Sequence, residues 1–444
     1  MNPLSSATLE GNIIDNNRGI GTSNILRLHN GIYRTANGSN SVYENYPLQL
    51  YVDDSTVNGF EPYRLANLSM TVHGGGTLNY TIPYLREIIQ GDWSDFTGTL
   101  VAYGINTEEA YSLLALDNNT GFPNNRVVTT GNTKIAAYSN EQVFAIGGLS
   151  GNAGTFLSCG GTKTPSFGNG ITTYIVGGAG TDETFNGIIN NHLYGYASEG
   201  SGTTTIIKTG AGLWRLNANN SYAGPTTIEE GKMIFNGNNT GIGKITVQEG
   251  AILAGKGSVA AAVAVAGILE PGDSSIGTFT LKDNLTLEAT AITSIDIDKT
   301  NNTSDVVNIA KDATYGGTLK LNVTGTPASG DKFKIFNVTG AVQGTITQFD
   351  PAVPGPGLLW VFKPALGELA VQSPNFVEAP SNLSLHAPVA PAGTPSMISC
   401  SWADNSGNED YFILERSIDN VTFTDIAHPA ANATSFNDGG CRPA

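Results

Sequence analysis

The sequence contains few of the residues on which many functional sites depend. Three cysteines and five histidines occur in 444 residues, and none of them has the close spacing of a zinc-binding motif. Three cysteines cannot build the dense disulfide network of a small secreted domain, although Cys400 and Cys441 lie in one segment and could pair. The chain must therefore be stabilised chiefly by apolar packing.

Charged residues are also scarce, and most are acidic. They make up 14% of the chain, and 38 Asp and Glu against 22 Lys and Arg give a formal net charge of −16. Nucleic acids and anionic membranes bind basic surfaces, so this balance disfavours both as partners. The longest apolar run, 260–269, is too short to span a bilayer, and its alternating Ala and Val fit a buried strand. We therefore expect no membrane span.

Helical periodicity is almost absent. The best candidate, 82–90, is short and carries Pro83 near its start. Gly occurs 55 times, and Asn, Thr and Ser are plentiful, which is typical of short strands joined by many turns. At 444 residues the chain is too long for one ordinary compact core. The composition predicts an all-β chain that is divided into several parts.

The most informative segment is 205–235, TIIKTGAGLWRLNANNSYAGPTTIEEGKMIF. Many of its distinctive residues fall at even spacing, with small or polar residues between them, which indicates short strands. They are Lys208, Gly210, Gly212, Trp214, Leu216, Asn220, Tyr222, Gly224, Thr226 and Ile228. This segment resembles the autotransporter-associated β-strand repeat, a module of secreted bacterial β-helical proteins. The resemblance implies an elongated body of stacked coils that is extracellular or on the bacterial cell surface.

Two further segments extend this resemblance. Residues 241–325 are similar to the tail of such passengers, with GKGSV at 255–259 and LEPGDSSIGT at 269–278. An aromatic residue, one spacer and a glycine also recur in the chain as Phe96-Thr-Gly98, Phe185-Asn-Gly187 and Tyr222-Ala-Gly224. Repeats of this kind bury their apolar faces by stacking on neighbouring coils. We expect a right-handed parallel β-helix (solenoid) with coils of about 20–25 residues, irregular over 1–200 and regular over 201–373.

The C-terminal part, 377–444, follows a Pro-containing junction and differs in pattern. It resembles the first half of a fibronectin type III domain, with strands expected at 379–385, 398–402, 411–417, 420–423 and 434–436. A complete sandwich of this type needs seven strands in about 100 residues. The resemblance therefore implies a partial β-sandwich, which is either truncated or completed by a strand from another chain. The N-terminus lacks a signal peptide, so we expect Met1 to begin a fragment of a longer exported protein.

Candidate ligand-binding residues are few. Exposed aromatic rings along a β-helix can stack on a linear glycan, and the candidates are Trp93, Tyr84, Trp214 and Tyr222. Packing within the coils is the competing interpretation, and for Trp214 and Tyr222 it is the stronger one. Asp296, Asp298 and Asp305 offer hard oxygen ligands for calcium, although their spacing is not that of an EF-hand and turn-capping explains them equally well.

Candidate catalytic groups are weaker still. Asp92 with Asp95, and Asp182 with Glu183, are paired carboxylates, but both pairs fall at turns, where Asp caps backbone N–H groups. A lyase would also need a basic residue beside a calcium-binding carboxylate cluster, and only Arg86 lies near the first pair. We therefore expect a non-enzymatic structural or adhesive stalk that binds polysaccharide or matrix. The alternatives are the non-catalytic arm of a pectate-lyase-like enzyme and a self-associating filament subunit.

Overall fold

A computed structural model describes most of the chain. The described residues are 7–10, 13–16, 25–35, 44–45, 49–54, 57–61, 66–82, 86–106, 112–118, 120–138, 142–160, 170–191, 202–374, 377–387 and 396–441. They contain 48 β-strands and one short 3-10 helix, η1 (Pro364–Leu366). Among them, no helix has the length and apolar character that a bilayer crossing requires. The chain divides into a large unit, which comprises Met1–Thr326 with Phe333–Ala352 and Phe362–Leu369, and a smaller unit, which comprises the remainder.

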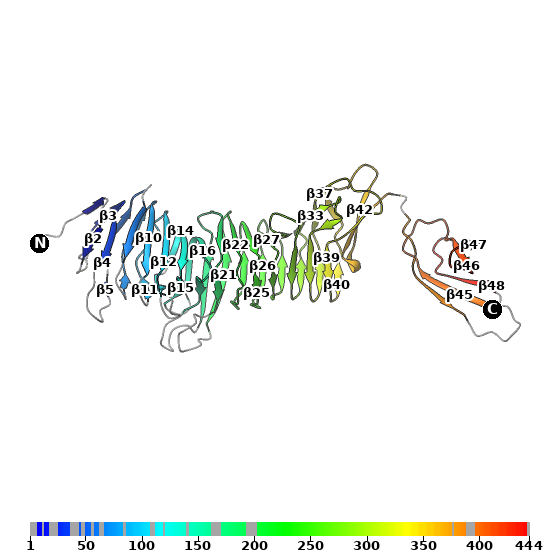
Figure 1. Ribbon diagram of the computed structural model, residues 1–444, viewed down its shortest axis with the longest axis horizontal. Helices are drawn as coiled ribbons and strands as arrows, with labels where there is room; N and C mark the ends of the chain where they lie inside the picture. The colour runs from blue at the N-terminus through cyan, green and yellow to red at the C-terminus, as the bar shows by residue number, and fades with distance from the viewer. Residues whose placement is uncertain are drawn as a thin grey trace. The chain divides into compact units, whose positions relative to one another are not determined.

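The large unit is a stack of coils, each of which contributes one strand to each of three parallel faces (Figure 1). Face 1 contains β1 (Ala7–Glu10), β3 (Ile25–His29), β6 (Gln49–Val52), β9 (Thr71–Gly74), β18 (Ile171–Val176), β21 (Thr203–Lys208), β23 (Thr226–Ile228), β26 (Ile245–Val247), β29 (Val263–Val265), β32 (Leu285–Leu287), β36 (Ala313–Tyr315) and β40 (Val342–Gly344). Face 2 contains β2 (Ile13–Asn16), β4 (Ile32–Thr35), β7 (Val57–Glu61), β10 (Thr77–Ile82), β12 (Thr99–Gly104), β19 (Glu183–Phe185), β22 (Leu213–Leu216), β24 (Lys232–Phe235), β27 (Ile252–Gly255), β30 (Ile268–Pro271), β33 (Ile292–Asp298), β37 (Thr318–Thr324) and β41 (Gln348–Asp350). Two long strands, β14 (Gly121–Gly131) and β16 (Val143–Gly151), contribute to both of these faces.

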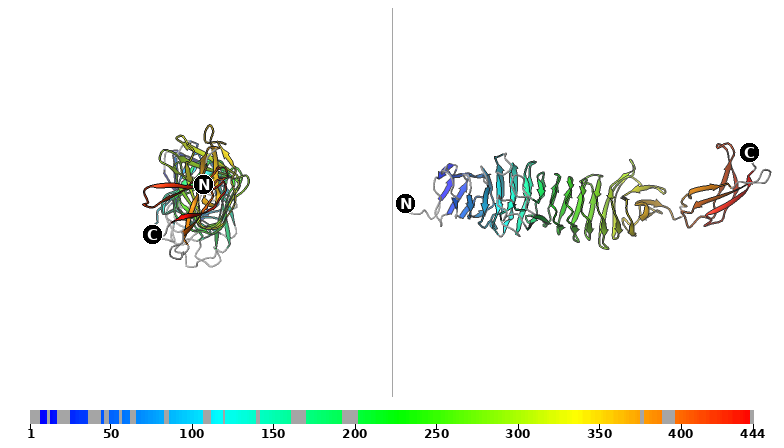
Figure 2. Two further views of the ribbon diagram at one scale, coloured as in Figure 1. Left: turned by 90° about the vertical axis from the view of Figure 1, so that its right-hand side faces the viewer. Right: turned by 90° about the horizontal axis from the view of Figure 1, so that it is seen from below.

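Face 3 completes the coil. It contains β5 (Glu44–Asn45), β8 (Ala66–Leu68), β11 (Arg86–Ile89), β13 (Leu113–Leu116), β15 (Lys134–Ala137), β17 (Phe156–Ser158), β20 (Ile188–Asn190), β25 (Asn238–Asn239), β28 (Ser258–Val259), β31 (Thr278–Leu281), β35 (Val306–Ile309) and β39 (Phe336–Val338). On each face, a strand pairs in parallel with its counterpart one coil later, as in β10 with β12 and β26 with β29. In Figure 2 the same strands follow one another in sequence order from a second direction. The predicted all-β solenoid of parallel coils is confirmed, and its right-handed winding stays a prediction.

The alternating pattern of the strands explains the core. In β10, β12 and β21 every second side chain is buried, because successive residues of a strand point to opposite faces. Buried residues then line up from coil to coil: the Tyr33 ring lies 5.7 Å from that of Phe60, which lies 5.3 Å from that of Tyr80. Apolar and aromatic side chains thus fill the interior of the stack.

The coils differ in length more than the sequence indicated. One turn takes 18 residues between Ile245 and Val263 but 32 residues between Ile171 and Thr203. The segment 82–90, the best helical candidate, contains strand β11 instead. The single strand expected at 279–287 divides into β31 and β32, which lie on different faces because the chain turns a corner between them.

The recurring aromatic-x-Gly motif does not mark one repeated position. Phe96 bridges to Gly74 near face 1, whereas Phe185 lies in β19 on face 2. The three aromatic rings are buried, and each glycine lies against the preceding coil, where a Cβ atom would be within 2.4 Å of an oxygen atom of that coil. The shared motif therefore solves one local problem, the close approach of two coils beside a large ring, at several corners.

The last coil of the large unit is covered by the chain itself. The Phe362 ring packs against those of Tyr315 and Phe336, at 5.1 and 5.8 Å between centroids. Gly367, which follows η1, accepts hydrogen bonds from the backbone N–H groups of Ile335 and Phe336. The uncapped coil end that motivated the filament hypothesis is therefore wrong for this end of the stack. The strands β38 (Lys332–Lys334), β43 (Glu368–Gln372) and β42 (Leu359–Lys363) form a separate sheet, and β34 (Thr303–Ser304) pairs with β33.

The smaller unit contains two antiparallel sheets near its C-terminus. One contains β44 (Ser381–His386), β45 (Ser396–Ala403) and β48 (Ser435–Cys441), and the other is a hairpin of β46 (Leu414–Ser417) and β47 (Phe423–Ala427). Strands are thus present close to all five predicted places, while the fibronectin type III assignment stays a prediction. The Cys400–Cys441 pairing is wrong, because Cys400 lies opposite Phe436 and Cys441 lies opposite Ser396. Four residues along a strand separate the two cysteines by about 13 Å, which is beyond the reach of a disulfide.

Candidate functional site

The repeat-like segment 205–235 is built around a buried lysine. Lys208 ends β21 with its side chain directed into the stack, and only 1% of the residue is exposed. Its Nζ donates hydrogen bonds to the backbone oxygens of Thr209 and Gly210, both at 2.7 Å, and of Glu230 at 3.1 Å. Burial lowers the pKa of this amine to about 8, against the opposing effect of Glu230 and Asp182. Since Glu230 belongs to the next coil, Lys208 fastens two coils together.

The aromatic residues expected to bind a glycan lie inside the stack. Trp93, Trp214 and Tyr222 are at most 1% exposed. The indole Nε1 of Trp214 donates to the Leu149 oxygen at 2.9 Å, and the Tyr222 hydroxyl lies 2.8 Å from Thr226 Oγ1. Stacking on a sugar requires an exposed ring face, and these three rings present none, so packing is their role in this structure. Tyr84 lies outside the described residues.

The aspartates expected to bind calcium are each engaged locally. Asp305 is buried and accepts hydrogen bonds from the N–H groups of Gly277 at 2.7 Å and Asp296 at 2.9 Å. Burial raises the pKa of Asp305 to about 6 in spite of these two hydrogen bonds. Asp296 accepts from Asn322, and Asp298 accepts from Asn301. Across the part of the chain that the structure describes, no group of three His, Cys, Asp or Glu side chains is arranged to hold a metal ion.

The paired carboxylates are fixed by hydrogen bonds. Asp92 accepts from the Ser94 N–H, which lowers the pKa of its carboxyl group, and Asp182 accepts from the Leu213 N–H. Glu183 is 3% exposed; burial opposes its ionisation, but hydrogen bonds from Arg126, Ser150 and Thr181 outweigh burial and lower its pKa. A general acid in a glycosidase needs the opposite shift. The side chain of Arg86 is not among those described.

Long-range ion pairs instead join distant coils. Arg126 donates to Glu183 through Nε at 2.6 Å and a terminal nitrogen at 3.1 Å. Arg215 binds Asp273 in the same two-point manner at 2.8 Å, and Asn236 adds a third contact to Asp273 at 2.8 Å. The second pair links the two segments that resemble autotransporter passengers. Bidentate pairs of this kind fix orientation as well as adding attraction.

Replacing Arg126 by methionine should lower the free energy of unfolding by about 2 kcal/mol, because Glu183 would remain buried without its cationic partner. Ser150 and Thr181 still donate to Glu183, which limits the loss. Urea unfolding followed by circular dichroism gives the measurement. Arg126→Lys is the matched control and should lose less, since it keeps the charge. Equal losses in both variants would contradict this account.

The exposed residues most suited to binding form a column on face 1 that the sequence did not indicate. Arg27, Tyr51 and His73 occupy adjacent positions in three successive coils. The Arg27 guanidinium lies 4.3 Å from the centre of the Tyr51 ring, and the His73 ring stacks on the Tyr51 ring at 4.6 Å. His73 continues the column through Nδ1, which lies 3.1 Å from Asp95.

A shallow cavity of about 250 Å³ opens beside this column. Its polar lining comes from Arg27, His29, Tyr51, Asp53 and Asp54, and the His29 ring nitrogen Nδ1 lies 2.6 Å from Asp53. The Asp54 carboxylate accepts from the Gly75 N–H of the next coil. The cavity therefore presents a cationic group, a phenol and two carboxylates within one outer surface of the stack. Such a lining can exchange several hydrogen bonds with a polyhydroxylated ligand.

Comparison with known proteins gives one match. Residues 206–233 match the family model described as the passenger-associated-transport-repeat. The matched segment contains Lys208, Trp214 and Tyr222, whose side chains pack and fasten the coils described above. A search among curated proteins found no match. An autotransporter-associated repeat of this kind implies a surface-exposed β-structure associated with autotransporter passengers and suggests secretion to the cell surface.

Proposed function

We propose that the chain is a mechanical and adhesive module of a cell surface, and that its work is structural instead of catalytic. The observation that carries this proposal is the continuous stack of parallel coils, in which an autotransporter-associated repeat fills one regular section. Each coil buries its apolar side chains against its neighbours, so length is gained without a new core. Such a stack suits the display of other domains away from a surface.

Hydrogen-bond ladders support the stalk role. Asn217 donates to the Asn186 side chain at 2.8 Å, and Asn236 donates to the Asn217 side chain at 3.1 Å. The three asparagines lie in successive coils, and the Asn236 oxygen accepts from the Lys256 N–H of the next one at 3.4 Å. Side chains thus join four coils along one corner, in addition to the backbone pairing on each face.

For the adhesive role, we propose that the face 1 column and its cavity bind polysaccharide. The support is chemical: Arg27, His29, Tyr51 and Asp53 offer donors and acceptors at an exposed surface. A linear glycan lying along the stack would meet equivalent positions of several coils in turn, as Arg27, Tyr51 and His73 do. The partner class that the sequence led us to expect is therefore kept, and its location is moved away from Trp93, Trp214 and Tyr222.

Binding of the purified chain to pectin, xylan and mannan in affinity electrophoresis tests this role. We expect one of these glycans to retard the chain, and Tyr51→Ala to weaken that binding at least tenfold by removing the centre of the column. Tyr103→Ala is the matched control, because Tyr103 is an exposed tyrosine on face 2 away from the cavity. Absence of retardation with all three glycans, or equal losses in the two variants, would remove the adhesive proposal and leave the stalk role standing.

A further inference from the structure

The smaller unit leaves a broad apolar surface uncovered. Six large apolar side chains there are more than half exposed, namely Leu383, Leu385, Ile413, Ile418, Val421 and Phe423. Leu385 lies opposite Cys400 in the register of β44 and β45, so both point to the side of this sheet on which Trp402 also lies. A sheet normally buries such a side against another layer. Contiguous exposed apolar surface of this kind marks an interaction site.

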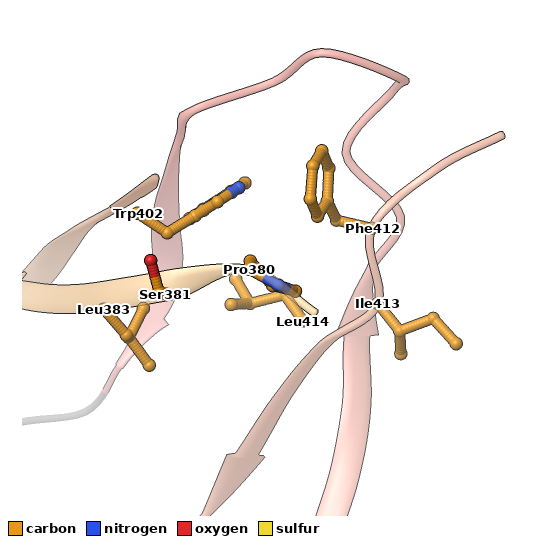
Figure 3. Close-up of a pocket in the computed structure, with 7 residues that line it drawn as sticks. All are labelled: Pro380, Ser381, Leu383, Trp402, Phe412, Ile413 and Leu414. Carbon is orange, nitrogen blue, oxygen red and sulfur yellow. The ribbon is translucent and has the colours of Figure 1, made fainter. Parts of the chain in front are cut away.

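This surface is hollowed into a groove. A cavity of about 670 Å³ lies between the three-stranded sheet and the hairpin, with Leu383, Leu385, Ile398, Leu414 and Phe423 among its lining residues. A smaller cavity of about 180 Å³ adjoins it and shares Leu383 and Leu414 (Figure 3). Residues of β46 and its flanks line both cavities. The groove therefore runs beside β46.

The backbone of β46 offers a docking edge. It pairs with β47 on one side only, and among the described residues no strand lies on its other side. Backbone N–H and C=O groups along an open edge can pair with an added strand. Leu414 and Arg416 alternate along this edge and both line the larger cavity. A strand added there would place alternate side chains into the groove.

A buried donor at the end of the groove points to a peptide. Trp402 is 8% exposed, and its indole Nε1 is buried without a hydrogen-bond partner. Figure 3 shows this indole beside the Phe412 ring, whose centroid lies 5.4 Å away. Leaving a buried N–H unpaired is costly, and a backbone carbonyl entering the groove would accept from it.

Charge decides which strand fits. Arg416 is engaged by Asp438 at 2.9 Å, so Glu415 and Asp419 give the groove an acidic rim. A second copy of this unit would bring the same acidic rim and be repelled. We propose that the groove binds an extended polypeptide of alternating apolar and basic residues, which adds as a strand to β46 and fills the groove with its apolar side chains.

A fluorescein-labelled ten-residue peptide of alternating valine and lysine, titrated with the full chain, tests this proposal. We expect micromolar binding, at least tenfold weaker binding of a valine–glutamate peptide, and no binding when proline replaces two central valines, because proline cannot donate to the edge. Hydrogen exchange should show protection of the β46 amides in the complex. Equal binding of all three peptides would overturn the proposal, because it would mean unspecific contact.

Two surface variants complete the test. Leu385→Arg should weaken peptide binding at least tenfold, because it places a cation in the apolar groove. Val421→Arg is the matched control, since Val421 is exposed but lines neither cavity, and it should leave binding unchanged. Both positions are exposed, so folding should be preserved. A chain that ignores the peptide and sediments as a dimer, which Leu385→Arg dissociates, would show a second copy as the occupant and overturn the proposal.

Discussion

Replacing Gly231 by alanine should cost the stack at least about 4 kcal/mol, whereas the same change at Gly250 should cost about 1 kcal/mol. Both glycines have positive φ angles, +66° and +82°, and they occupy the turns before β24 and β27 of successive coils. At Gly231 a Cβ atom would lie 2.3 Å from the Gly210 oxygen and 2.6 Å from the Gly212 oxygen. At Gly250 it would meet nothing within 4 Å.

The two glycines form a matched pair, because backbone strain is present in both and the collision with the preceding coil in only one. Urea unfolding by circular dichroism measures the loss, and hydrogen exchange over 206–256 locates it. We expect the Gly231 variant to expose amides of β21 to β24 while the Gly250 variant keeps them protected. Similar losses at both sites would mean that turn conformation, and not the close approach of coils, sets the need for glycine.

Replacing Lys208 by methionine should cost about 2 kcal/mol at pH 7, because three backbone oxygens lose their donor. The loss should grow to about 4 kcal/mol at pH 9.5. The folded chain holds the pKa of Lys208 near 8, whereas that of an unfolded lysine is about 10.4. Between these values the unfolded chain binds more protons, so wild-type stability rises with pH, by about 1.4 kcal/mol for each pH unit.

Urea unfolding of both proteins at pH 6.5, 8 and 9.5 measures this difference. The window ends near pH 10, because the pKa of buried Tyr222 is raised to about 12 and an unfolded tyrosine ionises first, which reverses the slope. Lys232→Met is the control, since Lys232 forms a partly exposed ion pair with Glu270 at 2.6 Å and should cost under about 1 kcal/mol at each pH. A Lys208→Met loss that does not change with pH would contradict the buried-amine account.

Local alternation carried most of what could be predicted about the fold. In 213–216 the sequence Leu-Trp-Arg-Leu already places Arg215 on the opposite side from Trp214 and Leu216, and the structure buries the latter two. The same parity argues against Trp214 as a glycan platform, so that signal was present in the sequence. Trp93 lies in a turn, where no alternation shows which way a ring points.

Contacts between coils could not be predicted from the sequence. The column of Arg27, Tyr51 and His73 depends on register between coils of 24 and 22 residues, and neighbouring coils differ from these lengths. A shift of one residue would turn each of these side chains to the other face. Likewise, Arg126 and Glu183 are 57 residues apart, and nothing local in the sequence relates them.

The unequal coils have a consequence for a molecule held under tension. Because each coil is fastened to its immediate neighbours, a pulling force would release the chain one turn at a time. An 18-residue turn would pay out about 60 Å of slack and a 32-residue turn about 110 Å. The tether would therefore lengthen in uneven steps, absorbing a sudden load in portions instead of parting at once.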